Sequence, residues 1–141
     1  MSEPEIIVTN NEQETSAAGE HFAARLHAGD VVLLYGDLGA GKTAFVRGIA
    51  RGLGATADEV TSPTFTLMQQ YRGRLTLVHV DLYRLAPEEV GGLGLEESTD
   101  DPAVIAIEWA ERWSGAPADA WSVRISEDGE DRRRIEIRTG D

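Results

Sequence analysis

The sequence contains no cysteine and a single lysine, although 13 of its 141 residues are basic. Without cysteine, neither disulfides nor thiolate metal sites can form. No apolar run approaches the roughly 20 residues of a membrane-spanning helix, and residues 1–10 show neither the basic region nor the apolar stretch of a signal peptide. We therefore expect a cytoplasmic protein with no membrane span.

Basic charge is also scarce, since 25 acidic residues give a formal net charge of −12. A chain of this charge is repelled by phosphate backbones, so we do not expect an RNA-binding module. The one basic cluster, Arg132 to Arg134, follows the acidic stretch EDGED. It is typical of a solvated hairpin end, with a small anion or nucleic-acid contact as the alternative.

The length and the 41% hydrophobic content suit one globular domain over residues 1–141. Apolar spacing predicts an alternation of strands and helices. The expected helices begin after Asn10 or Asn11 and near Lys42, with a short third helix in residues 87–93 and a short helix or turn from Trp109. The expected strands are 5–9, 31–35, 103–108, a pair within 65–81 and a hairpin over 121–137.

Residues 36–43, GDLGAGKT, match the phosphate-binding pattern G-x-x-x-x-G-K-[ST] between a buried strand and a helix start. The glycines let backbone amides converge on a phosphate, and the helix dipole adds positive potential. The Thr43 hydroxyl is a ligand for magnesium. The predicted nucleotide contacts here are Gly36, Asp37, Leu38, Gly39, Ala40, Gly41, Lys42, Thr43 and Ala44.

The lysine of this pattern, Lys42, is the only one in the chain. An ammonium is a compact point charge that fits inside a tight loop and reaches two phosphates, whereas the wide, planar guanidinium prefers a side-on approach. Every other Lys or Arg position of the chain is an arginine. The exception at residue 42 therefore indicates a specific task for this side chain.

Two carboxylates end apolar strands in the way ligands of an open α/β sheet do. Asp81 follows LTLVHV, and Glu108 ends AVIAIE. Either one is able to bind magnesium or to orient the attacking water. The alternative for Glu108 is a surface ion pair with Arg112, four residues on.

Three further features carry weaker signals. Thr61 and Ser62, in the hydroxyl-rich TSPTF, suit either a loop that senses the γ-phosphate or an ordinary turn. Trp109 suits the core better than a lid over the site. The histidines show no metal-ligand spacing, and we assign no catalytic role to His21, His27 or His79.

The motifs GDLGAGKTAF, SPTF, HVDLYRL and IEWAER, in this order and at these separations, resemble the TsaE (YjeE) family. The resemblance covers most of the chain. It implies a P-loop NTPase fold of the α/β class, with a mostly parallel central sheet, flanking antiparallel strands and helices on both faces. It also implies an ATPase that supports formation of threonylcarbamoyladenosine at position 37 of tRNAs reading ANN codons, together with TsaB and TsaD partners that hold the tRNA.

The resemblance also suggests roles for single residues. ATP would lie on residues 37–43, with magnesium at Thr43 and Glu108 and with Asp81 near the same ion. Thr61 and Ser62 would form the switch loop, with Trp109 beside the site. The weaker candidates for the adenine side are Glu12, Thr15 and Arg132.

Two other functions use the same loop. A small-molecule phosphotransferase would need an acceptor pocket and a lid, for which 141 residues leave little room. A nucleotide-gated assembly module would bind ATP without hydrolysing it. GTP is disfavoured, because the chain contains no N-K-x-D sequence to read guanine.

Overall fold

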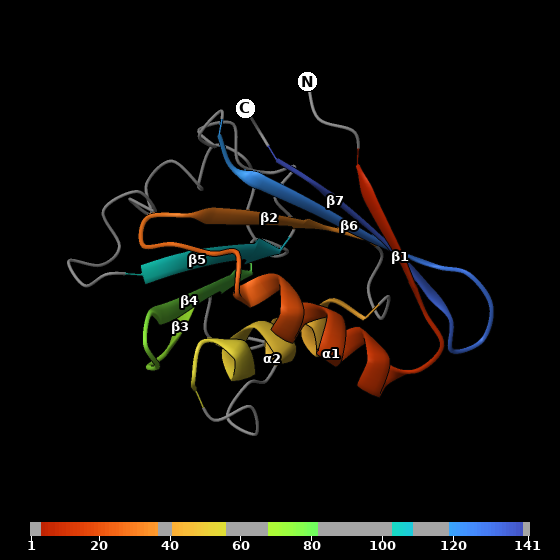
Figure 1. Cartoon of the computed structure of the whole chain (residues 1–141), viewed down its shortest axis with the longest axis horizontal. Helices are drawn as coiled ribbons and strands as arrows, with labels where there is room; N and C mark the ends of the chain where they lie inside the picture. The colour runs from red at the N-terminus through yellow and green to blue at the C-terminus, as the bar shows by residue number, and fades with distance from the viewer. Residues whose placement is uncertain (1–3, 37–40, 56–67, 82–102, 109–118, 140–141) are drawn as a thin grey trace.

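The computed structural model describes residues 4–36, 41–55, 68–81, 103–108 and 119–139. Within these residues, strands form one seven-stranded sheet in the order β1-β7-β6-β2-β5-β4-β3, with two helices packed against it (Figure 1). The helices are α1 (Glu12–Ala23) and α2 (Lys42–Gly52). The strands are β1 (Glu5–Thr9), β2 (Val31–Tyr35), β3 (Met68–Tyr71), β4 (Thr76–Asp81), β5 (Ala103–Glu108), β6 (Trp121–Glu127) and β7 (Arg133–Arg138).

These elements confirm the expected strands and the first two expected helices. The helix expected in residues 87–93 and the helix or turn expected from Trp109 lie outside the described residues.

The centre of the sheet is parallel and its two sides are antiparallel. β2 lies between β5 and β6 and pairs with both in parallel, and β4 pairs in parallel with β5. The pairs β3–β4, β6–β7 and β1–β7 are antiparallel. This arrangement confirms the expected P-loop core, and it brings the carboxyl ends of β2, β4 and β5 to one edge, where ligands of such sheets bind.

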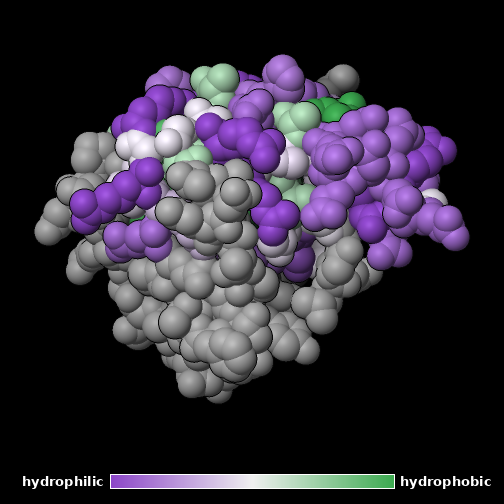
Figure 2. Space-filling model, turned by 90° about the horizontal axis from the view of Figure 1, so that it is seen from below, coloured by the Kyte–Doolittle hydropathy of each residue, from purple (hydrophilic) through white to green (hydrophobic). Residues whose placement is uncertain are grey.

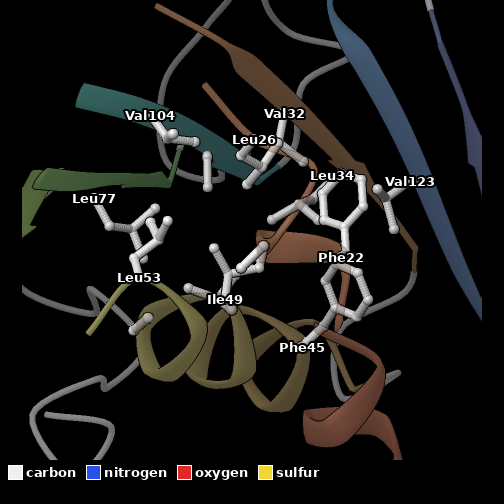
Figure 3. Packing of buried hydrophobic residues seen from close by; sticks show 14 of the residues in the cluster. Phe22, Leu26, Val32, Leu34, Phe45, Ile49, Leu53, Leu77, Val104 and Val123 are labelled. Carbon is white, nitrogen blue, oxygen red and sulfur yellow. The ribbon is translucent and has the colours of Figure 1, made fainter. Parts of the chain in front are cut away.

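Both described helices cover the same face of the sheet, and the main core lies between them and the strands (Figures 1 and 3). Phe22, Phe45 and Ile49 of the helices meet Leu34 and Val123 of the strands. The opposite face is also shielded at its centre, since Val78, Val80 and Ile107 are 0% exposed. The expectation of helices on that second face falls outside the described residues.

The two helices approach each other closely because three glycines line their contact. A Cβ atom at Gly19 would collide with the backbone oxygen of Phe45, and one at Gly48 with the backbone oxygen of Ser16. At Gly52 a Cβ atom would lie 2.5 Å from that of Ala23. The close contact fixes α1 along α2 from Phe45 to Gly52.

Side-chain contacts hold both ends of α1. The N-terminal end is capped by a residue next to its first turn, and the C-terminal end is held to the sheet. Asn11 caps the helix, its side-chain oxygen accepting from the Glu14 amide at 2.8 Å. Near the other end, the Arg25 guanidinium lies 2.8 Å from the Glu5 carboxylate on β1 and 4.9 Å from the Trp121 ring centroid on β6. These contacts set α1 across β1 and β6.

The described surface on the helix side is mostly hydrophilic, with small and separate hydrophobic areas (Figure 2). None of the helices in the described ranges is long and apolar enough to cross a membrane.

The helix contact predicts the effect of Gly48→Ala. Helix propensity alone favours alanine by about 1 kcal/mol. The collision with Ser16 should outweigh this gain and lower the free energy of unfolding by about 2–3 kcal/mol, as overpacked cores do. Urea denaturation followed by circular dichroism measures the change.

The control is Gly29→Ala. Gly29 has a φ of +92° and no atom within 4 Å of an added Cβ, so this substitution reports backbone strain alone, about 1 kcal/mol. A Gly48→Ala protein as stable as the wild type would show that the helices are not held in this contact.

Candidate nucleotide-binding site

The phosphate loop lies between the central strand β2 and the start of α2. Gly36 follows the strand directly, and Gly41 precedes the helix with a φ of +103°, a conformation that favours glycine. The predicted strand before the loop and the predicted helix after it are therefore confirmed. Asp37, Leu38, Gly39 and Ala40, predicted to contact the phosphates, lie outside the described residues.

Lys42 is buried at the first position of α2, with 4% of its surface exposed. Its ammonium donates a hydrogen bond to the backbone oxygen of Gly36 at 2.8 Å and lies 3.9 Å from Oε1 of Glu108. The positive charge is therefore held inside the loop, where the helix dipole of α2 adds to it. Thr43 and Ala44 follow on the first turn of the same helix.

Glu108 and Asp81 occupy corresponding positions on neighbouring strands. They are register partners at the carboxyl ends of the parallel strands β5 and β4, as their sequence positions predicted. The Glu108 side chain is only 6% exposed, so Glu108 is not the surface residue of the alternative interpretation. Its carboxylate lies under the start of α2, within reach of the lysine.

The structure brings to this site one residue that sequence reasoning passed over. His79 of β4 is 0% exposed, and its Nε2 lies 2.6 Å from Oε2 of Glu108. An imidazole in the middle of the apolar strand LTLVHVD was the available signal, because a strand buried in a parallel sheet is otherwise apolar. His21 and His27 are exposed, away from this carboxylate.

The N-terminal part of α1 lies beside the phosphate loop. The Thr15 methyl group would be 3.7 Å from a Cβ atom at Gly41. The Thr15 hydroxyl donates to the Asn11 backbone oxygen at 3.2 Å and lies 2.7 Å from the Thr9 hydroxyl. Thr15 thus presents its methyl group to the loop, while its hydroxyl is engaged within the chain.

A hollow of about 510 Å³ opens between the N-terminal part of α1 and the outer side of α2. Glu12 lines it, and its carboxylate lies 3.5 Å from the Arg47 guanidinium. The described residues that line it are Asn11, Glu12, Gln13, Ser16, Ala44, Arg47, Arg51 and Asp131. Its size suits a small ligand, and Ala44 connects it to the phosphate loop.

The basic cluster divides between two sides. Arg132 is exposed in the turn before β7, 3.9 Å from Asp128, as expected for a solvated hairpin end. Arg133 is half-buried, and its Cγ and Nε would be 3.7 Å from a Cβ atom at Gly41. Sequence reasoning selected Arg132, but Arg133 is the arginine beside the loop. The alternation in RRIEIR, in which 133 shares a face with the buried Ile135, was the signal.

Thr61, Ser62 and Trp109 lie outside the described residues, so their predicted places beside the site stay predictions.

A family model described as "Threonylcarbamoyl adenosine biosynthesis protein TsaE" matches residues 9–135 of the chain. The chain belongs to the TsaE family. Curated relatives agree with this family assignment. The TsaE protein of Nostoc sp. is 42% identical over 93% of this chain and 83% of the relative, and that of Bacillus subtilis is 43% identical over 90% and 80%. The TsaE protein of Treponema pallidum is 48% identical over 74% of this chain and 78% of the relative.

The TsaE fold is also seen in a solved structure. The crystal structure of Bacillus subtilis YdiB superposes with a TM-score of 0.78 and 35% identity, covering 100% of this chain and 88% of that one. Sequence and structure therefore agree on the family and on the fold.

The paired hydroxyls near the loop predict the effect of Thr15→Val. The change leaves the Thr9 hydroxyl, which is buried, without its partner and should lower the free energy of unfolding by about 1–2 kcal/mol. The double variant Thr9→Val/Thr15→Val removes both polar groups and should recover part of this loss. Urea denaturation of the wild type, Thr9→Val, Thr15→Val and the double variant measures the coupling, and strictly additive effects would contradict it.

Proposed function

We propose that this chain is an ATPase of the cytoplasm that binds and hydrolyses Mg-ATP at its phosphate loop. It would support formation of the threonylcarbamoyl group on adenosine 37 of tRNAs reading ANN codons, acting with TsaB and TsaD proteins. Membership of the TsaE family supports the biosynthetic role. The geometry around Lys42 supports the chemistry.

The observation that carries the proposal is the buried lysine between Gly36 and Glu108. An ammonium at the start of α2, at the carboxyl edge of parallel strands, is the arrangement that binds the terminal phosphates of a nucleotide. A phosphate approaching this loop offers Lys42 several oxygen acceptors in place of one carbonyl. Lys42 would then stabilise the negative charge of the transferred phosphoryl group.

Magnesium would be held by oxygen ligands from Thr43, Asp81 and Glu108. Among the described residues, no three His, Asp or Glu side chains form a metal cluster. Magnesium is usually held by one or two carboxylates together with phosphates and water. The buried carboxylate of Glu108, close to Lys42 and to the α2 start, suits such a shell. When bound, the ion supplies charge neutralisation on the phosphates.

Hydrolysis also needs an oriented water molecule. Glu108 or Asp81 would accept its hydrogen bond, while the other completes the metal shell. Because the two residues are register partners on β5 and β4, both strands end at the same point of the site. Positioning and charge compensation are then the whole of the protein's task.

The base and ribose would extend from the loop toward α1. The hollow lined by Glu12 adjoins Ala44, and Thr15 and Arg133 flank Gly41. Arg133 is thus the better-placed arginine for this side, ahead of Arg132. Thr15 would contribute its methyl group to the wall of the site.

Partner proteins would close the site and hold the tRNA. A net charge of −12 disfavours direct contact of this chain with the tRNA backbone. Thr61 and Ser62 would sense the γ-phosphate, and Trp109 would lie beside the nucleotide. We expect slow hydrolysis by the chain alone.

The buried position of Lys42 predicts that arginine cannot replace it. Lys42→Arg and Lys42→Ala should each weaken ATP binding by about 10- to 100-fold, equivalent to one charge-assisted hydrogen bond of about 1.5–3 kcal/mol. The guanidinium is too wide for a place that is 4% exposed. Isothermal titration calorimetry measures the affinity. Arg138→Lys, on the exposed end of β7, is the matched control, and wild-type affinity in Lys42→Arg would contradict the prediction.

The proposed function predicts ATP hydrolysis that TsaB and TsaD stimulate and that Lys42→Ala abolishes. Steady-state phosphate release by the chain, alone and with both partners, measures it. Intact nucleotide binding without stimulation would contradict the proposal. Transfer of labelled phosphate to a metabolite would then identify a phosphotransferase. Function retained in Glu108→Ala but lost in Lys42→Ala would identify an assembly module that binds ATP without hydrolysing it.

A further inference from the structure

The two oxygens of the Glu108 carboxylate have different neighbours. Oε2 lies 2.6 Å from Nε2 of His79, and Oε1 lies 3.9 Å from the Lys42 ammonium. His79 and Glu108 come from neighbouring parallel strands, with His79 in register with Ala106, two residues before Glu108. The imidazole and the ammonium therefore meet different oxygens of the same carboxylate.

The chemistry of the pair sets the direction of its hydrogen bond. A carboxylate only accepts, so the imidazole donates from Nε2. Among the described residues, Nδ1 of the same ring has no hydrogen-bond partner. Among the residues that the structure describes, the bond to Glu108 is thus the one polar contact of a ring that is 0% exposed.

Packing alone does not account for a histidine at this place. Burying an imidazole costs free energy that an aliphatic side chain of similar size, such as the equally buried Leu77 on the same strand, does not cost. One short hydrogen bond to a carboxylate offsets that cost. The side chain on which the ring acts is Glu108.

We propose that His79 is a positioning residue for Glu108. By occupying Oε2, it fixes the rotation of the carboxylate and keeps Oε1 turned toward Lys42 and the phosphate-binding end of α2. This inference rests on the proposed function, in which Glu108 acts on Mg-ATP. Partners that orient the ligands of a metal site in this way strongly affect metal affinity and activity.

The first experiment tests the pair in the protein without nucleotide. Nuclear magnetic resonance of 15N-histidine-labelled protein reports which ring nitrogen carries the proton. We expect His79 to carry it on Nε2 and its signals to shift in Glu108→Ala, while those of the exposed His21 and His27 stay unchanged. A proton on Nδ1 alone, or His79 signals that do not respond to Glu108→Ala, would overturn the proposal.

The second experiment compares His79→Leu with His79→Gln. Leucine keeps the packing and removes the donor, whereas the glutamine amide restores an N–H near the Nε2 position. His79→Leu should lower kcat and raise the Mg²⁺ concentration for half-maximal nucleotide binding by about 10- to 100-fold, with little change in binding of nucleotide without Mg²⁺. His79→Gln should recover most of both.

The matched control is Leu77→Ala, because Leu77 is equally buried on the same strand and is in register with Val104, four residues before Glu108. It should lower the unfolding temperature without changing the Mg²⁺ midpoint, which is the Mg²⁺ concentration for half-maximal nucleotide binding. An equal loss of kcat in Leu77→Ala and His79→Leu would show that His79 acts only through core packing and would overturn the proposal.

The Mg²⁺ midpoint, read with a fluorescent ATP analogue, separates this inference from the proposed ATPase. If the wild type binds Mg-nucleotide but does not hydrolyse it, the ATPase proposal is wrong and a shifted midpoint in His79→Leu still supports positioning. An unchanged Mg²⁺ midpoint in His79→Leu overturns the positioning role, whether or not the wild type hydrolyses ATP.

Discussion

The buried carboxylate of Glu108 is the constraint on which the centre of the structure depends. A charge removed from water is tolerated only where cationic or donor groups meet it, and here Lys42 and His79 come from two different elements. Meeting this requirement fixes the start of α2 over the end of β5 and fixes β4 beside it. The same contacts that stabilise the charge therefore build the candidate nucleotide site.

The glycines between the helices extend this constraint to α1. Because Gly19 and Gly48 allow backbone contact, α1 lies close enough to α2 for Thr15 to reach Gly41 of the phosphate loop. Bulkier residues there would separate the helices and open the wall of the site. Packing in the helix layer and the shape of the site are thus set by the same small residues.

The sequence patterns predicted the described helices and strands and the strand-end positions of Asp81 and Glu108, because these depend on local spacing. Neighbouring residues in the sequence are enough to recognise the apolar run 31–35, the glycine loop and the strand-end positions of Asp81 and Glu108. The His79–Glu108 contact joins residues 29 apart through the register of β4 and β5. Periodicity describes which face a residue takes, but it does not say which strand lies next to it, so this pair escaped prediction.

The single lysine of the chain is also the one buried basic residue among those described. Lys42 is 4% exposed, whereas the side chains of Arg25, Arg51 and Arg132 are 42%, 50% and 55% exposed. Arginine serves at the surface, where its fork spans several partners, while a compact ammonium fits between a carbonyl and a carboxylate. Lys42 lies buried between the Gly36 oxygen and the Glu108 carboxylate, so a compact ammonium suits position 42 better than a guanidinium. The buried Glu108 carboxylate therefore accounts both for the single lysine in the composition and for the place of Lys42 at the centre of the candidate site.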